Sequence, residues 1–97
     1  MDPGTSALIV SDVVESLAGH DKGKLFYVIK VDDTTCYLVN GKDRTLDKPK
    51  LKKRRHVKKV LRAETRVAAR LRAGDKVLNS ELRRDLAEIS QKLQSKT

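Results

Sequence analysis

The stretch Ala18-Gly-His-Asp-Lys-Gly-Lys-Leu-Phe-Tyr-Val-Ile-Lys-Val31 joins a charged turn to a run of apolar residues. The run Leu25–Val31 is rich in β-branched and aromatic residues, which favour a pleated, half-buried strand. The turn before it, residues 18–24, holds two glycines and two lysines, which is more length and charge than a tight hairpin needs. The stretch therefore predicts a β-turn-β unit whose turn contacts something besides its own strands.

The residues that follow predict another strand and a hairpin. Asp32-Asp33-Thr34 supplies a turn, and Thr35–Val39 then alternates its side chains between two faces. Asn40-Gly41 comes next and is a strong hairpin signal, because both residues accept a positive φ. Arg44-Thr45 is expected to pair back across this hairpin. Asp47-Lys48-Pro49 is expected to break the pairing, because proline cannot donate to a ladder.

Two outer strands complete the predicted sheet. Ile9-Val10 and Val13-Val14 form a first strand region, which the polar pair Ser11-Asp12 interrupts. His56–Val60 is expected to form the last short strand, with Val57 and Val60 touching the core. Four or five short strands in about fifty residues predict a mainly β fold with a small barrel over residues 7–60, because closure hides the strand edges.

The C-terminal third changes to helical spacing. Apolar residues recur there every three or four positions, which predicts one apolar face of a helix: Leu82, Leu86, Ile89 and Leu93. Asn79 or Ser80 can cap the start of this helix. A shorter helix is predicted from Glu64 to Ala73, with Gly74 ending it. Residues 61–97 are therefore predicted to form a helical C-terminal extension.

Net charge is distributed unevenly along the 97 residues, which fit one small domain after a disordered arm predicted over residues 1–6. Of the total charge of +9, residues 1–41 carry −3 and residues 63–97 carry +3. Residues 42–62 carry eleven lysines and arginines against two aspartates, a net +9. Charge this concentrated is typical of a surface that binds a polyanion.

The residue inventory argues against a metal site and against catalysis. One cysteine, Cys36, and two histidines, His20 and His56, cannot form a four-ligand zinc site or an intrachain disulfide. Cys36 is best explained as a small buried hydrophobe. No phosphate-binding loop, dinucleotide fingerprint or nucleophile motif is found, so we predict no enzyme, no cofactor and no small-molecule substrate. The apolar run Ala7–Val10 is too short for a signal peptide or a membrane span, and a cytoplasmic protein is expected.

The residues around Gly23 can be interpreted in two ways. Gly23 is either a plain turn glycine between the solvated charges of Lys22 and Lys24, or it lets the backbone approach a phosphate chain that the lysines neutralise. Three aromatic residues are too few for a platform that stacks single-stranded bases. Phe26 and Tyr27 point to opposite faces of one strand. One is expected in the core and the other under the C-terminal helices or against RNA.

The run Lys48-Pro-Lys-Leu-Lys-Lys-Arg-Arg-His-Val-Lys-Lys59 places eight cations in twelve residues. These charges repel one another, so the run is expected to be an ordered element only with a counter-charge. It is a solvated charge run, a membrane-surface segment or a phosphate-binding segment. The second reading lacks a lipidation site and an adjacent amphipathic apolar face. RNA is favoured because Arg54 and Arg55 can fork onto phosphate oxygens while the lysines act as point charges.

Several of these segments together resemble a KOW motif, a short β-loop-β unit centred on a glycine. The resemblance begins with Val13-Val-Glu-Ser16, continues through the turn 18–24 and ends with the strand to Val31. The later Tyr37-Leu-Val-Asn-Gly41 and the basic stretch ending Arg54-Arg-His-Val57 narrow it. With them, the chain resembles the archaeal and eukaryotic type-fourteen protein of the large ribosomal subunit and its small bacterial relatives.

This resemblance covers about residues 9–60, with Gly23 as the central glycine. Ser11 stands where the ribosomal relatives often have glycine, and Phe26 stands where many KOW motifs have a second glycine. The resemblance implies an SH3-like β-barrel that binds structured RNA. We therefore predict an RNA-binding protein of the translation machinery, whose partner is ribosomal RNA or another structured RNA.

The predicted RNA-binding residues lie in the turn, the hairpin and the basic stretch: His20, Lys22, Gly23, Lys24, Lys42, Arg44, Lys48, Lys50, Lys52, Lys53, Arg54, Arg55, His56, Lys58 and Lys59. His20 is expected to hydrogen-bond within its turn or to a sugar or phosphate. An alternative stays open, a KOW or SH3-like protein-interaction module that docks on RNA polymerase or a ribosome-associated factor. Its interface would be an exposed strand edge and the apolar helical stripe.

Overall fold

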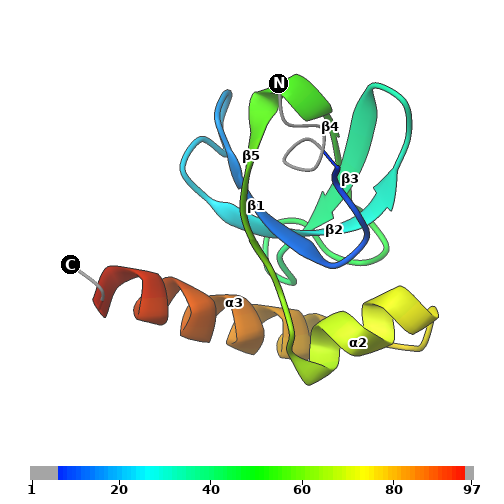
Figure 1. Cartoon of the computed structure of the whole chain (residues 1–97), viewed down its shortest axis with the longest axis vertical. Coiled ribbons are helices and arrows are strands. Elements are labelled where there is room, and N and C mark those ends of the chain that lie inside the picture. The colour runs from blue at the N-terminus through cyan, green and yellow to red at the C-terminus, as the bar shows by residue number, and fades with distance from the viewer. Residues whose placement is uncertain (1–6, 96–97) are drawn as a thin grey trace.

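The computed structural model describes residues 7–95, so the arm predicted at residues 1–6 lies outside the described residues. Five strands form one antiparallel sheet in the order β4-β3-β2-β1-β5, and two helices follow (Figure 1). The elements in chain order are β1 (Asp12–Ser16), β2 (Leu25–Val31), β3 (Thr35–Val39), β4 (Lys50–Lys53), the 3₁₀ helix η1 (Arg54–His56), β5 (Val57–Arg62), α2 (Arg66–Ala73) and α3 (Asn79–Ser95). The predicted antiparallel sheet and the helical C-terminal extension are confirmed, whereas β4 and β5, at the two edges of the sheet, do not pair with each other.

Strands β2 and β3 have the bounds that the sequence predicts. The turn between β1 and β2 is closed by two backbone hydrogen bonds, from Ser16 N to Lys24 O at 3.0 Å and from Gly23 N to Ser16 O at 2.8 Å. Gly23 has φ +89°, in the left-handed region that favours glycine. A Cβ built on Gly23 would meet nothing within 4 Å. The backbone angle, and not crowding, therefore explains this glycine.

The first strand begins later than predicted, because the backbone turns at Ser11. Ser11 has φ +81° and its N–H donates to the Val28 carbonyl at 2.7 Å. Ile9 and Asp12 close the turn, since Asp12 N donates to Ile9 O and Ile9 N donates to the Asp12 carboxylate. The prediction that Ile9-Val10 belongs to a strand is therefore wrong.

The segment after β3 is a long loop across which β3 pairs with β4, and not the short hairpin that Asn40-Gly41 predicts. The N–H groups of Asn40 and Gly41 both donate to the Arg44 carbonyl, at 2.8 and 3.0 Å. Thr45 forms an isolated bridge with Lys48, so Arg44-Thr45 does not pair back onto β3. The asparagine-glycine pair starts a loop here because the Asn40 side-chain oxygen also accepts two loop N–H groups.

The basic run over residues 48–59 folds into regular structure, where the sequence predicted a break and a short last strand. It supplies β4, η1 and the start of β5, and β5 continues to Arg62. One counter-charge comes from within the protein: buried Asp12 lies 3.7 Å from Lys59 Nζ of the run and 3.0 Å from Nε of Arg62, just beyond it. This carboxylate offsets part of the repulsion that the run carries.

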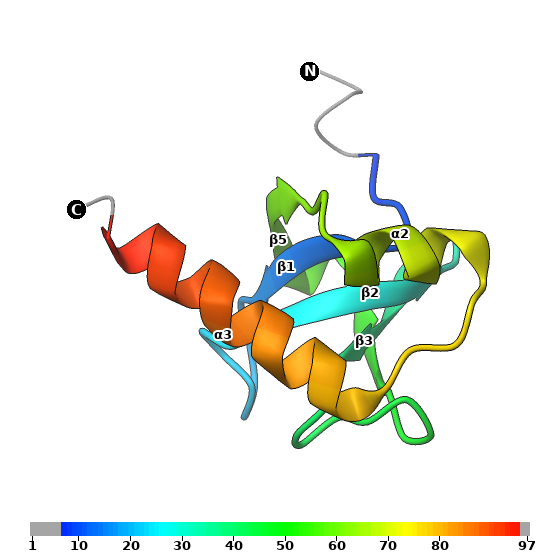
Figure 2. The ribbon, with the colours of Figure 1, turned by 90° about the horizontal axis from the view of Figure 1, so that it is seen from below.

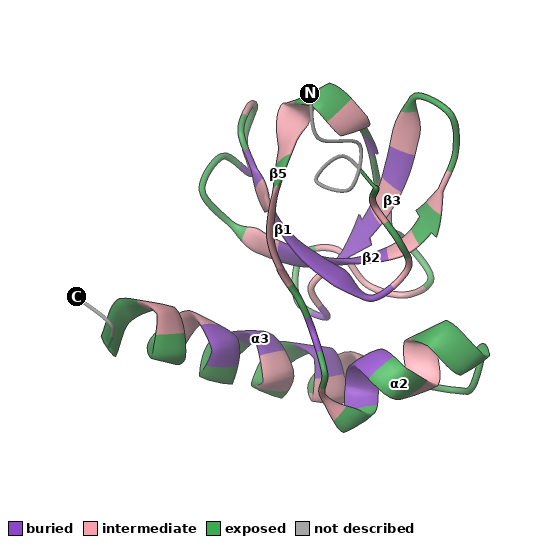
Figure 3. Cartoon of the chain, in the orientation of Figure 1, coloured by how far each residue is buried: buried purple, intermediate pink, exposed green. Residues whose placement is uncertain are grey.

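Apolar side chains on the two faces of the sheet form two clusters. Figure 3 shows the burial of each described residue along the ribbon. The inner cluster lies within the curve of the sheet and consists of Val14, Phe26, Val28, Cys36 and Leu38. The outer cluster joins Val13, Tyr27 and Val39 to residues of the helices. Phe26 in the inner core, Tyr27 beneath the helices and a buried Cys36 all confirm sequence predictions. Burial raises the pKa of the Cys36 thiol.

Both helices lie on the outer face of the sheet (Figure 2). α2 begins after Thr65, whose hydroxyl accepts from Ala68 N, and ends at Gly74 in the left-handed conformation. Its predicted end is confirmed, and its start lies two residues later than predicted. The predicted stripe on α3 is buried against the sheet through Leu82, Leu86 and Ile89. No helix within residues 7–95 is long and apolar enough to cross a membrane.

Candidate nucleic-acid interface

The glycine turn, defined as residues 18–24, contacts η1 at its start. The N–H of Leu17, just before the turn, donates to the His56 carbonyl at 2.8 Å. The Lys52 ammonium donates to the Ala18 carbonyl at 2.7 Å. These two contacts hold the start of the glycine turn against the basic segment that links β4 to β5.

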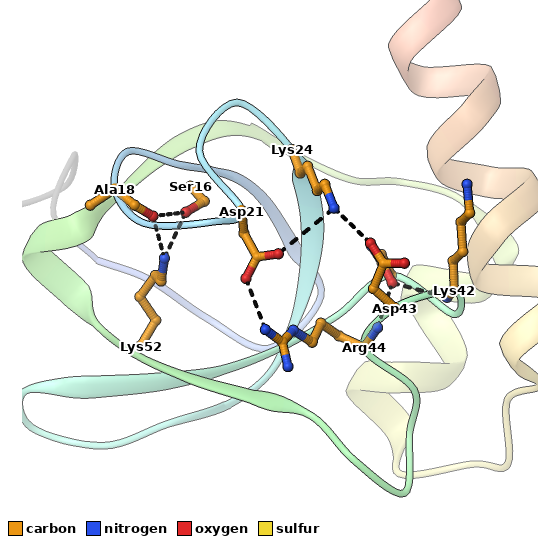
Figure 4. A network of polar contacts seen from close by, with 9 residues as sticks. Ser16, Ala18, Asp21, Lys24, Lys42, Asp43, Arg44 and Lys52 are labelled. Atoms are coloured by element: carbon orange, nitrogen blue, oxygen red, sulfur yellow. Dashed lines mark hydrogen bonds and ion pairs between the residues drawn. The ribbon is translucent and has the colours of Figure 1, made fainter.

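The end of the glycine turn contacts the loop over residues 40–48 (Figure 4). Lys24 Nζ lies 2.7 Å from Asp43 Oδ2, and Arg44 lies 3.3 Å from Asp21 Oδ2. The hydrogen bond to Asp43 raises the pKa of Lys24, and the same bond lowers the pKa of Asp43. Asp21 is buried, so its carboxylate anchors the Arg44 guanidinium from within the fold. The glycine turn therefore connects the two basic segments in space.

Lys52 is a predicted RNA-binding residue that the structure places in the interior. It pairs with Cys36 on the neighbouring strand, and paired residues share a face of the sheet. Its ammonium donates to Ser16 Oγ at 2.8 Å as well as to Ala18 O (Figure 4). A buried charge needs such partners, so Lys52 holds the glycine turn in place and is not available to a phosphate.

Arg54 and Lys59 are also engaged within the protein. Arg54 donates through its guanidinium to the carbonyls of Asp32 and Asp33, at 3.4 and 3.2 Å, and its N–H bonds to Thr34 O. These bonds attach η1 to the turn between β2 and β3. Lys59 lies beside buried Asp12, as described above. With Lys24, Arg44 and Lys52, they form a structural subset of the predicted cations.

The remaining predicted cations are open to a ligand. Within residues 7–95, the side chains of seven make neither a hydrogen bond nor a salt bridge, and we call them the open cations: Lys22, Lys42, Lys48, Lys50, Lys53, Arg55 and Lys58. Lys22 belongs to the glycine turn, Lys42 and Lys48 to the loop, and the others to β4, η1 and β5. The elements that carry them are the glycine turn itself and the segments that contact it. His20 is exposed, and His56 is half-buried and contacts the turn through its carbonyl.

Helix α3 contributes residues that the sequence analysis did not assign to a site. Arg83 donates to the Gly41 carbonyl at 2.6 Å, and Asn79 accepts from the Leu46 N–H at 2.9 Å. Gly41 has φ +77°, and a Cβ there would collide with the Asn79 carbonyl oxygen. The only sequence signal was the Arg83-Arg84 pair beside the apolar stripe. Its contact with the loop depends on tertiary packing.

The described part of the chain holds no group of three or more histidine, cysteine, aspartate or glutamate side chains placed to bind a metal ion. No protein-family model matches the chain, and no curated protein matches it significantly. The likeness to KOW proteins therefore rests on the motifs of the chain itself.

Proposed function

We propose that the protein is a KOW-type RNA-binding protein of the translation machinery, with ribosomal RNA as its partner and no catalytic activity. The observation that carries this proposal is the set of seven open cations on the glycine turn and on the segments that contact it. They sit on elements held by the buried contacts of Lys52, Asp21 and Asp12. An ordered cationic surface loses little conformational entropy when it binds a phosphate backbone.

Under this proposal the sheet is an SH3-like barrel. Its support is the strand order, in which β1 lies between β2 and β5, and the 3₁₀ turn η1 that joins the two outermost strands β4 and β5. The strands curve around the inner cluster, as the view down the molecule illustrates (Figure 1). The curvature presents the glycine turn and η1 as neighbouring parts of one surface.

Binding is electrostatic in the first place. The lysines act as point charges on phosphates, and the Arg55 guanidinium can accept a phosphate in a two-pronged geometry. Such contacts set position and orientation and carry no base sequence. We place this activity in the cytoplasm as part of the proposal.

A charge-removal experiment tests the proposal. We expect the triple substitution Lys53→Ala, Arg55→Ala, Lys58→Ala to weaken binding to purified ribosomal RNA at least tenfold. If all seven open cations contact phosphates, log K falls with log salt at a slope of about −5 to −6, and the triple variant reduces that slope by about 2 to 3. Fluorescence anisotropy over a salt series measures both quantities.

A matched control removes three cations elsewhere. Arg66, Lys76 and Lys92 are exposed and make no side-chain contact in the described chain, so their substitution by alanine changes net charge equally. This control is expected to keep the wild-type slope. Equal losses in both triple variants, or a flat salt dependence of the wild type, would contradict the proposal.

The alternative, a protein-interaction module, loses one of its two expected surfaces. Leu82, Leu86 and Ile89 are largely buried against the sheet, so the helical stripe offers no extended interface to a protein partner. The other surface is the unpaired edge of β4, where Leu51 is 52% exposed. A protein partner that binds the charge-removed triple variant as tightly as the wild type would favour this alternative.

A further inference from the structure

A groove lies where the glycine turn, the loop 40–48 and α3 meet. Its volume is about 560 Å³, which falls within the range of small-molecule sites. Leu25, Leu86 and Ala87 supply an apolar lining, and Lys24, Lys42 and Arg83 supply cations. The groove therefore combines a surface for a flat apolar group with a surface for an anion.

The cations of the groove differ in whether their side chains are already bound to another group of the protein. Lys24 is held by Asp43, and Arg83 is held by the Gly41 carbonyl. Lys42 is exposed and makes no side-chain hydrogen bond or salt bridge within residues 7–95, and it lies beside α3 (Figure 4). Three cations against the single carboxylate of Asp43 give the lining a net positive charge. An anionic ligand in the groove would thus meet two held cations and one open ammonium.

The wall on α3 combines two small residues with the longer Arg83 and Leu86. Ala87 and Ser90 lie one turn apart on the helix and both line the groove. On the opposite side, Gly23 also lines it and has open space around its Cα. Gly23, Ala87 and Ser90 keep part of the groove open, and its volume can admit a planar ring.

We propose that this groove holds one unpaired nucleotide of the bound RNA, with its base against Leu25, Leu86 and Ala87 and its phosphate at Lys42. The inference rests on the proposed function, because the open cations next to the groove would hold the flanking phosphates. A base inside a duplex is stacked and paired, so only an unpaired base can enter. An isolated phosphate would gain nothing from the apolar lining.

Two variants with the same chemical change test the groove. Ala87→Leu fills it without changing charge, and Ala69→Leu places the same side chain on an exposed position of α2. The probes are an RNA hairpin with one unpaired adenosine and the same hairpin fully paired. We expect the wild type and Ala69→Leu to prefer the bulged hairpin about tenfold, as burial of one base face against aliphatic side chains can supply. Ala87→Leu is expected to bind both hairpins equally.

Two further binding measurements distinguish failure of the groove assignment from failure of RNA binding. Lys42→Ala is expected to reduce the preference for the bulge without altering the fold, and adenosine monophosphate is expected to bind far more weakly than the bulged hairpin. Equal wild-type binding of the two hairpins would overturn the inference and leave RNA binding standing. Adenosine monophosphate binding as tightly as the bulged hairpin would overturn the assignment to RNA. Absence of binding to either hairpin and to ribosomal RNA would overturn the proposed function as well.

Discussion

At the scale of single residues, Gly41 shows how one side-chain hydrogen determines where a helix docks. Its positive φ is shared with Gly23, but the surroundings differ. Gly23 faces open space, whereas Gly41 touches the backbone of Asn79 at the start of α3. The Arg83 guanidinium then bonds to the Gly41 carbonyl. Both the loop and the helix depend on this close approach.

Gly41→Ala is expected to destabilise the protein more than Gly23→Ala. Placing alanine in the left-handed region costs about 1–2 kcal/mol at either position. The collision with the Asn79 backbone adds about 1–3 kcal/mol at Gly41 alone. Urea unfolding of the two variants measures the difference. Equal losses would mean that α3 does not depend on this contact.

Tyr27 joins the sheet to both helices through one hydroxyl. The hydroxyl bonds to Asp85 of α3 and to Thr65 at the start of α2. Burial, reinforced by the hydrogen bond to Asp85, raises the pKa of Tyr27 well above its usual value near 10. The pKa of Tyr27 is higher in the folded than in the unfolded protein. The contribution of its neutral hydroxyl to the free energy of unfolding is therefore complete below about pH 10 and is lost as pH rises beyond it.

Tyr27→Phe is therefore expected to change the alkaline stability profile. At neutral pH the variant loses about 1–3 kcal/mol, because Asp85 and Thr65 lose their shared partner. Above about pH 10 the free energy of unfolding of the wild type should fall faster than that of the variant. The difference in stability between the two proteins therefore becomes smaller. Denaturant unfolding across pH 7 to 11, with Tyr37→Phe as the control, gives this comparison. A constant gap would show that Tyr27 titrates normally.

At the scale of elements, α3 is held by the apolar stripe that its sequence predicts. Leu82 is fully buried, whereas Leu78, one turn earlier and just before the helix, is 53% exposed. The helix start is also secured by Glu81, whose carboxylate accepts from the Leu78 N–H. That bond, with help from Arg70, lowers the pKa of Glu81. Burial of the stripe leaves the opposite face of α3 polar.

Leu82→Ala is expected to cost about 2–5 kcal/mol of stability, as for other buried leucines. Leu78→Ala, the same change at an exposed site, is expected to cost less than about 0.5 kcal/mol. Thermal unfolding followed by circular dichroism distinguishes the two. Similar losses would mean that the stripe is not the main contact between α3 and the sheet.

At the scale of the whole molecule, sheet and helices share one core. The outer cluster contains Val13, Tyr27 and Val39 from the strands together with Val67, Ala68, Leu82, Leu86 and Ile89 from the helices. The division predicted between residues 7–60 and 61–97 marks a change of secondary structure. Because the outer face of the sheet is apolar, it needs the helices to cover it.

We expect the protein to unfold in one cooperative transition. The helical signal in far-ultraviolet circular dichroism and the near-ultraviolet signal of the buried Tyr27 should have the same midpoint. Leu82→Ala should move both midpoints together. A helical signal that disappears first would show that the helices form a separate unit.

Some features of this protein were predictable because they depend on neighbours in sequence. The β-branched run of β2, the alternation of β3, the stop at Gly74 and the stripe on α3 are local patterns, and the structure confirms them. The concentration of charge in residues 42–62 is likewise a property of the chain alone. So is the match to a KOW motif around Gly23, which stays a prediction.

Tertiary structure alone decided which cations are open and which are structural. Nothing local distinguishes Lys52 from Lys53, yet strand pairing turns Lys52 inward to Ser16 and leaves Lys53 exposed. Asn40-Gly41 predicted a hairpin, but the structure has a loop there. The shape of this loop depends on contacts with Asn79 of α3, which is distant in sequence. Local sequence determines backbone preference over a few residues. The environment of a side chain depends on partners distant in sequence, and only the folded chain brings those together.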